Sequence, residues 1–369
     1  MKLISNHEIH RTSPADGAAL AGAWAMAKDK LLVACAVFST RQIQFLLIDG
    51  EGRLLDKCAP DVHATRVVGV EIDETTMQLC LVEHTMLAPS EHERTVVEKP
   101  HWGEISVSDA GLCWRGFPGT DGDWLQWSTV GIRQWTAQQE WYAVARPDPF
   151  QSNSFLIRAQ VVPGRRPDFV PSGPPFTRCT PMGEYFIDHR YDGDWHALME
   201  LRRWDTPSFA VDITPRGQTR GEIADIYAYG TTESQRIVWW FYNKKIKRDK
   251  RDASLWFGSV GADHSAPKKT RLIESNVVLD PRYHPLLDGR TLMTWTEGLG
   301  WKTARLRYAI FGTDLQALSH PEDWPLAPQG MAPMIVDHGG SISILQMLQE
   351  AETRDFVLHL AHATLPVPT

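Results

Sequence analysis

The chain has 369 residues, of which 43% are hydrophobic and 22% are charged, and this balance excludes an intrinsically disordered protein. The net charge of −7 argues against bulk electrostatic binding to nucleic acid or to an anionic membrane surface. No run of about eighteen apolar residues occurs, so no transmembrane helix is expected. The N-terminal segment has no apolar core of a signal peptide.

Five cysteines are widely spaced and form no C-x-x-C pair: Cys35, Cys58, Cys80, Cys113 and Cys179. An odd number without framework spacing predicts reduced thiols, and together with the initiator Met1 it predicts a cytoplasmic protein. Cys35 and Cys80 lie inside apolar strand patterns, so we expect them to be small core residues. No cofactor or metal motif occurs in the sequence.

Two short β-type segments recur as a predicted hairpin seven times along the chain. The copies span residues 30–52, 77–84 with a later partner, 140–164, 194–217, 236–263, 290–314 and 341–363. Marker residues in neighbouring copies lie between 40 (Leu198 to Val238) and 64 (Leu79 to Ala143) positions apart. A period in this range built from strands alone is typical of a β-propeller. The sequence therefore predicts an all-β protein, a single domain over residues 1–369 that forms one closed propeller of seven four-stranded blades.

Each repeat has room for two further strands. A short strand ahead of the hairpin ends in an acidic turn in four copies, with Asp73, Asp192, Asp288 and Asp337 at nearly equivalent places. Aspartate suits such turns because its side chain accepts hydrogen bonds from nearby backbone N–H groups. The alternative is a ring of carboxylates at one mouth of the axial channel. A short polar outer strand is predicted after the hairpin, for example at 53–58 and 316–321.

The last repeat lacks an outer strand, because only TLPVPT follows Ala363. Residues 2–10 precede the first repeat and belong to none of the repeats, so we expect this N-terminal strand to complete the last blade and close the ring. The longest interval between neighbouring copies, from Leu79 to Ala143, contains more residues than a repeat needs, and the extra residues fall within 85–130. We interpret them as a loop insertion or as a misread repeat boundary.

Fifteen tryptophans make the chain unusually rich in this residue, and many lie in or beside predicted strands. Packing between neighbouring blades is the simplest role for them. One group differs in its setting: Trp295, Glu297 and Trp301 surround a glycine-bearing turn. Indole rings beside a carboxylate suit a sugar ring, so this group is a candidate ligand-binding site.

The densest charged segment is NKKIKRDKR at residues 243–251, between two apolar strands. It predicts a hairpin tip whose basic residues are candidates for contact with an acidic protein partner or, as the less favoured alternative, a nucleic-acid backbone: Lys244, Lys245, Lys247, Arg248, Lys250 and Arg251. A solvated, solubilising tip explains the same charges. The histidines between 84 and 101 match no compact metal site and are expected in a loop.

No nucleophile elbow, P-loop, dinucleotide fingerprint or zinc-protease motif is present. The chain also lacks the paired marks of WD-type propellers, since its single Trp204–Asp205 falls inside a predicted turn, and it lacks the Ser-x-Asp-x-Gly-x-x-Trp box of sialidase-like propellers. The sequence therefore favours a non-catalytic scaffold that presents loops to partner proteins. The alternative is a carbohydrate-binding or glycoside-hydrolysing propeller with a carboxylate and tryptophan site at the channel mouth.

Overall fold

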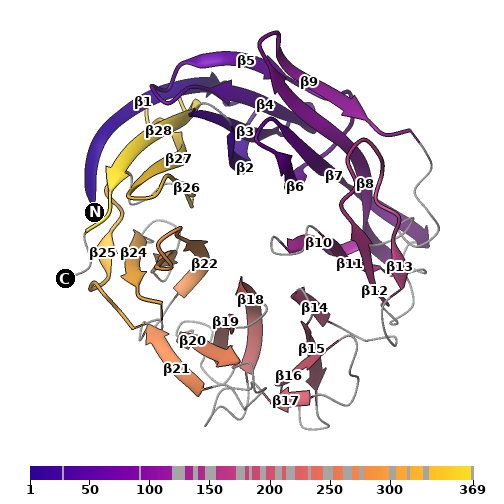
Figure 1. Ribbon diagram of the computed structural model, residues 1–369, viewed down its shortest axis with the longest axis vertical. Coiled ribbons are helices and arrows are strands. Elements are labelled where there is room, and N and C mark those ends of the chain that lie inside the picture. The colour runs from indigo at the N-terminus through magenta and orange to yellow at the C-terminus, as the bar shows by residue number, and fades with distance from the viewer. Residues whose placement is uncertain are drawn as a thin grey trace.

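The computed structural model in Figure 1 describes most of the chain. The described residues are 1–26, 29–90, 93–118, 129–135, 140–145, 155–171, 179–182, 185–191, 197–203, 210–212, 221–231, 234–243, 252–260, 268–273, 278–298, 305–313, 316–326 and 332–366. Within these ranges every regular element is a β-strand, and the strands form seven four-stranded sheets. The predicted all-β fold is confirmed. No helix in the described part of the chain has the length and apolarity needed to cross a bilayer.

We number the sheets in chain order. Sheet 1 contains β2 (Ala18–Met26), β3 (Lys30–Val37), β4 (Gln42–Ile48) and β5 (Leu54–Cys58). Sheet 2 contains β6 (Arg66–Asp73), β7 (Thr76–Ser90), β8 (Glu93–Ser108) and β9 (Gly111–Gly116). Sheet 3 contains β10 (Thr129–Trp135), β11 (Glu140–Ala145), β12 (Phe155–Gln160) and β13 (Val170–Pro171). Sheet 4 contains β14 (Cys179–Met182), β15 (Tyr185–Tyr191), β16 (Ala197–Arg203) and β17 (Ala210–Asp212).

The remaining sheets follow the same plan. Sheet 5 contains β18 (Gly221–Thr231), β19 (Ser234–Asn243), β20 (Asp252–Val260) and β21 (Lys268–Ile273). Sheet 6 contains β22 (Val278–Pro285), β23 (Thr291–Glu297), β24 (Arg305–Phe311) and β25 (Glu322–Asp323). Sheet 7 contains β26 (Met334–Asp337), β27 (Ser341–Gln349), β28 (Phe356–Thr364) and β1 (Lys2–Thr12).

Sheets 1 to 6 are antiparallel meanders of consecutive strands, whereas sheet 7 has the order β1-β28-β27-β26. Strand β1 pairs with β28 from Lys2 opposite Thr364 to Thr12 opposite Phe356. The prediction that the N-terminal strand completes the last repeat is confirmed by this pairing. Figure 1 shows the sheets arranged around a common centre, with the two chain ends near each other beside sheet 7. This is a β-propeller-like arrangement.

Alternation along strand β3 explains how one sheet packs on both of its neighbours. Successive side chains of a strand point to opposite faces of its sheet. Leu32, Ala34 and Ala36 pack in one core with sheet 2, and Leu31, Val33 and Cys35 pack in another core with sheet 7. All six are at most 2% exposed, so β3 reads as a continuous apolar run with no solvent face. The first and last complete repeats of the chain are therefore in direct contact.

Buried tryptophans fill the space between sheets, as the packing interpretation predicts. Trp141 of sheet 3 is fully buried and meets Trp102 of sheet 2 edge to face, with ring centroids 4.9 Å apart. Trp324 packs between sheets 6 and 7. Cys35 and Cys80 are buried among these cores as expected, and burial raises the pKa of the Cys35 thiol to about 12.

Sheet 4 corrects one predicted hairpin. The sequence placed the central pair of this repeat within 194–217, but β15 and β16 are its second and third strands and β17 is the outer one. The true first strand, β14, has only four residues and includes Pro181, so it carries no strand signature. Asp192 lies outside the described residues, whereas the other three predicted turn aspartates lie at or just after the end of a first strand.

Those three aspartates have the turn geometry that their sequence context predicts. The Oδ1 atom of each accepts the backbone N–H two residues later, from Thr75 at 2.8 Å for Asp73, from Arg290 at 3.0 Å for Asp288 and from Gly339 at 2.9 Å for Asp337. The backbone hydrogen bond from Thr75 is the main cause that lowers the pKa of Asp73. These carboxylates therefore stabilise turns.

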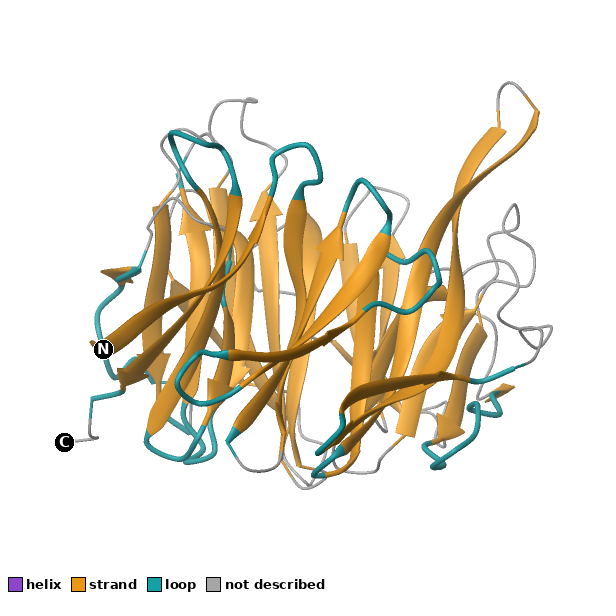
Figure 2. Cartoon of the chain, turned by 90° about the horizontal axis from the view of Figure 1, so that it is seen from above, coloured by secondary structure: helices purple, strands orange, loops and turns teal. Residues whose placement is uncertain are grey.

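The β7–β8 hairpin is the longest in the described chain, with strands of 15 and 16 residues. Figure 2 shows a long hairpin projecting beyond the rest of the sheets. The segment 84–101 belongs to this hairpin, so the expectation of a loop there was wrong. The histidine and glutamate side chains that can be placed form local pairs: His84 with Thr65 at 2.8 Å and His101 with Glu83 at 3.1 Å. Part of the excess length predicted within 85–130 lies in this hairpin, and the insertion itself stays a prediction.

An ion-pair cluster ties β1 to the β27–β28 turn. The Arg11 guanidinium lies 2.6 Å from Glu350, 3.1 Å from Asp355 and 2.9 Å from Glu8. The hydrogen bond from Arg11 is the main cause that lowers the pKa of Glu350 to about 2. The cluster therefore couples the attachment of β1 to the charge of the Glu350 carboxylate.

This coupling predicts an acid-dependent effect of Arg11→Gln. A carboxyl whose pKa is depressed in the folded state stabilises the fold above its ordinary pKa of 4.5, and this contribution is lost as the pH falls toward 2. The variant should melt slightly below the wild type at pH 7, by a small margin because the pair is exposed, and the difference should vanish at about pH 2 in melting curves recorded across that range. Arg354→Gln, in the same turn, is the control. A difference that persists unchanged at low pH would show that Arg11 acts through packing alone.

Candidate functional site

The basic segment singled out by the sequence lies between β19 and β20, outside the described residues. The two flanking strands pair with each other up to Asn243 opposite Asp252, so the segment does connect a hairpin. Its role in binding a partner stays a prediction.

The aromatic group around residue 297 is only partly described. Trp295 is fully buried, and among the described residues no acceptor meets its indole N–H. A ring without an exposed face contributes packing. Glu297 is partly exposed, and its carboxylate lies 3.8 Å from the Arg307 Nε atom. Trp301 falls outside the described residues, so ligand binding by this group stays a prediction.

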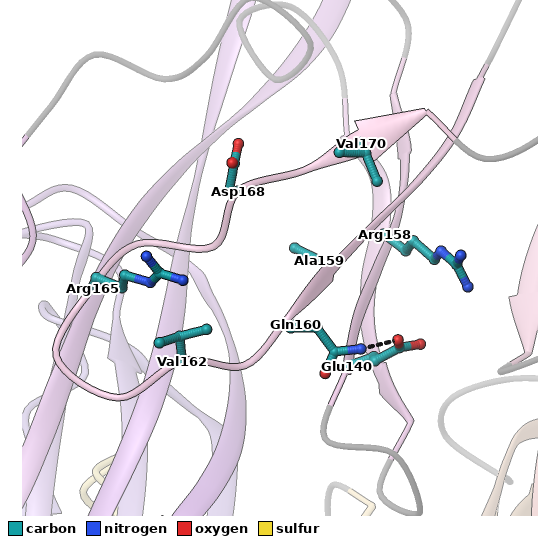
Figure 3. A pocket seen from close by; sticks show the side chains of 8 residues that line it. All are labelled: Glu140, Arg158, Ala159, Gln160, Val162, Arg165, Asp168 and Val170. Carbon is teal, nitrogen blue, oxygen red and sulfur yellow. Dashed lines mark hydrogen bonds between the residues drawn. The ribbon is translucent and has the colours of Figure 1, made fainter.

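A polar pocket that the sequence did not indicate lies in sheet 3 and has a volume of about 370 Å³. It is lined by Glu140, Arg158, Ala159, Gln160, Val162, Arg165, Asp168 and Val170. Figure 3 shows Glu140, Arg158 and Gln160 on the strands, and Val162, Arg165 and Asp168 on the loop that follows β12. Its size and mixture of charged, amide and aliphatic groups suit a small polar ligand.

Strand pairing brings the first three polar groups to one face. Glu140 is directly opposite Gln160 across β11 and β12, and Arg158 precedes Gln160 by two residues, so all three share a face of sheet 3. The intervening residues Trp141 and Ala159 point to the other face, into the core with sheet 2. The Gln160 amide donates a short hydrogen bond to the Glu140 carboxylate, which orients that buried group.

The loop 161–169 is fixed by the neighbouring sheet. Gln78 of β7 is fully buried, and its side-chain amide donates to the carbonyls of Val162 and Arg165, both at 3.0 Å. The Gln78 side-chain oxygen accepts the Trp141 indole N–H at 2.6 Å. One glutamine thus ties together the loop and β11.

Gly164 adds two further attachments to the same loop. Its N–H donates to the Glu104 carboxylate, and its carbonyl accepts from Arg115 at 2.9 Å. The residue has a φ of 75°, a conformation that glycine adopts readily and other residues rarely do. Four hydrogen bonds from sheet 2 therefore hold the loop that carries Arg165 and Asp168, and the pocket wall is preorganised.

Two sequence signals could have pointed to this site. A glutamine inside the apolar run MQLCLV is an unexpected polar residue in a buried strand, and such residues are buried only with partners. The segment GRRPD directly follows a strand and concentrates charge in a short loop. What the sequence could not show is that this glutamine, 84 and 87 residues before Val162 and Arg165, holds that loop.

No family model matches the chain, and no curated protein matches it. Solved structures share its fold. An α-L-arabinanase from Penicillium chrysogenum complexed with arabinobiose aligns over 99% of both chains at 7% identity, with a TM-score of 0.51. An α-L-arabinofuranosidase from Fusarium graminearum with an iminosugar inhibitor aligns over 99% of both chains at 10% identity, with a TM-score of 0.52. The polysaccharide lyase Uly1 aligns over 99% of this chain and all of its own at 10% identity, with a TM-score of 0.53.

These comparisons correct the functional interpretation of the sequence. The preferred interpretation as a non-catalytic scaffold that presents loops to partner proteins is wrong, because the fold is shared with carbohydrate-active enzymes. The alternative reading fits better. At identities of 7% to 10% the likeness shows the fold alone, so the chemistry of this chain has to be argued from its own residues.

Proposed function

We propose that this protein is a carbohydrate-active β-propeller that binds its saccharide in the sheet 3 pocket. The observation that carries the proposal is the pocket itself: two carboxylates, two guanidinium groups and an amide line one cavity of about 370 Å³. Sugar hydroxyls both donate and accept hydrogen bonds, so carboxylate, amide and guanidinium groups together match them. The aliphatic groups of Val162 and Val170 supply apolar contact for the C–H surface of a sugar ring.

The likeness in fold to an arabinanase and an arabinofuranosidase supports a saccharide as the ligand class.

We further propose that the seven sheets are the blades of one closed ring. The core shared by sheets 1 and 7 and the pairing of β1 with β28 favour that arrangement. Cytoplasmic localisation stays a prediction.

Binding is tested by calorimetry with arabinobiose as a neutral probe, first on the wild type and then on Asp168→Asn. Asp168 is exposed in the pocket loop, and losing its charge should weaken binding about tenfold, since a hydrogen bond to a charged group is worth roughly 1.5–3 kcal/mol. Asp61→Asn, an exposed aspartate remote from the pocket loop in sequence, is the control and should bind as the wild type does. Absence of binding by any saccharide in a neutral and acidic panel would overturn the proposal.

Hydrolysis is tested separately with a panel of glycosides. Glycosidases commonly use a pair of carboxyl groups flanking the scissile bond, so turnover lost in Glu140→Gln would place the reaction in the sheet 3 pocket. Turnover lost in Glu297→Gln instead would place it at the sequence-predicted group around residue 297. Binding without turnover in the wild type would leave a carbohydrate-binding protein.

A further inference from the structure

We infer that the sheet 3 pocket selects an acidic saccharide, one whose sugar ring carries a carboxylate. This inference rests on the proposed function, because it names the substrate class of the same site. It begins from Arg158 and Arg165, which line the pocket from the strand and from the loop. In Figure 3 the Arg158 side chain extends away from the loop, on the side of the strand where Gln160 and Glu140 lie.

Neither guanidinium group has a hydrogen bond or an ion pair with another residue in the part of the chain that the structure describes. Both residues are exposed, so their charges are available to a ligand. This distinguishes them from the arginines that form ion pairs within the described part of the fold. Arg11 and Arg290 are each held by carboxylates, at 2.6 Å and 2.7 Å respectively.

The two carboxylates of the pocket balance the formal charge of the two arginines, but the four groups differ in exposure. Glu140 is buried and accepts a hydrogen bond from Gln160, whereas Arg158, Arg165 and Asp168 are exposed. Arg115 and Glu104 both lie next to the loop, at the carbonyl and the N–H of Gly164, so their opposite charges offset each other. A ligand in the pocket therefore meets two exposed guanidinium groups and one exposed carboxylate, which favours an anionic ligand.

Arginine recognises a carboxylate through two parallel N–H···O bonds in one plane, which gives both strength and orientation. A neutral sugar offers no such partner. The hydrogen bond from Gln78 to the Arg165 carbonyl fixes the backbone there, so ligand binding has to order the arginine side chain but not the loop. The remaining polar groups, Asp168 and Gln160, then suit the hydroxyls of the same sugar.

The test compares a tri-galacturonate with its fully methyl-esterified form, which keeps the rings and linkages and removes the charge. The wild type should bind the acid about tenfold or more tightly than the ester at low salt, and the advantage should shrink as salt is raised. Arg158→Gln and Arg165→Gln should each reduce the ratio of the two affinities, and the double variant should bring it close to one. The affinity for the ester should fall by a smaller factor than the affinity for the acid in all three variants, because hydroxyl contacts are lost without loss of a charge pair.

Arg53→Gln is the matched control, because Arg53 is an exposed arginine in the β4–β5 turn of sheet 1. It should leave the ratio unchanged, and melting temperatures confirm that every variant is folded. Equal binding of acid and ester by the wild type overturns the acidic preference while leaving carbohydrate binding intact. If neither trisaccharide nor arabinobiose binds at all, the proposed function fails together with it.

Discussion

Deletion of residues 1–11 should lower the melting temperature of this protein by roughly 5–10 °C, because a change of several kcal/mol in a chain of this size shifts the midpoint by that much. The deletion removes β1, which pairs with β28 along nearly its whole length. It also removes Met1 and Leu3 from the core shared by sheets 6 and 7, and Ile9 from the core shared by sheets 1 and 7. Thermal melting followed by circular dichroism measures the shift.

Removal of β1 also leaves the edge of β28 unpaired, and an exposed edge strand promotes association between chains. We therefore expect the shortened protein to aggregate at concentrations at which the full chain does not, as measured by light scattering. Ile4→Thr is a control within the same strand, because the Ile4 side chain is 62% exposed and contributes little to either core. If the shortened protein melts at the same temperature as the full-length chain, the N-terminal strand does not stabilise the fold.

The sequence predicted the parts of the fold that repeat with a strong apolar signal. The central hairpins of sheets 1, 2, 3, 5, 6 and 7 lie where the apolar runs indicated, and the assignment of residues 2–10 to the last repeat followed from counting strands. Short strands were harder to place. Strand β13 has two residues and β25 has two, so their pairing depends on the neighbouring strand rather than on any pattern of their own. The outer strand expected at 316–321 is accordingly found at 322–323.

In sheet 4 the local sequence pattern predicts the wrong position for a strand. Residues 185–191 directly precede Asp192, so the sequence predicts them as the first strand of the repeat. They form the second strand, because the weakly patterned β14 pairs on their other side. This shift by one strand also explains why the interval between the marker residues Ala143 and Leu198 is longer than the next interval, from Leu198 to Val238.

The candidate site was not predictable from the sequence, because its members become neighbours only through long-range pairing. Glu140 and Gln160 meet across a strand register, while the loop with Arg165 is positioned by Gln78 of another sheet. By contrast, the residues that the sequence did single out owed their prominence to composition. The run of lysines and arginines near residue 247 and the pair of tryptophans near residue 297 are conspicuous in the chain, yet Trp295 is a core residue.

The buried glutamine that joins sheets 2 and 3 leads to the second large prediction. Gln78→Leu keeps the approximate volume of the side chain but removes one acceptor and two donated hydrogen bonds. The Trp141 indole N–H is then buried without a partner, and the loop loses two of its four attachments. We expect the free energy of unfolding to fall by about 2–4 kcal/mol, as buried polar groups left unpaired cost roughly 1–3 kcal/mol each. Urea denaturation measures this change.

Loop 161–169 should also become mobile in Gln78→Leu, and this effect can be separated from the loss of stability. The chain offers a matched control in sheets 6 and 7, where the buried Gln346 side chain accepts the Trp324 indole N–H at 3.0 Å. Gln346→Leu leaves an equivalent indole unpaired in a core far from the pocket, so it should destabilise the fold by about 1–3 kcal/mol. Hydrogen exchange of the amides in 161–169 should accelerate in Gln78→Leu and not in Gln346→Leu.

Saccharide affinity should depend on the order of loop 161–169 rather than on the free energy of unfolding of the whole protein. If Gln78 preorganises the pocket, Gln78→Leu should weaken binding about tenfold under conditions in which both variants are fully folded, because Arg165 and Asp168 must then be ordered at the moment of binding. Gln346→Leu should bind as the wild type does. Equal weakening in the two variants would mean that binding responds to general destabilisation. Unchanged exchange in the loop of Gln78→Leu would mean that Glu104 and Arg115 suffice to hold Gly164, and that the glutamine serves only to satisfy the buried indole.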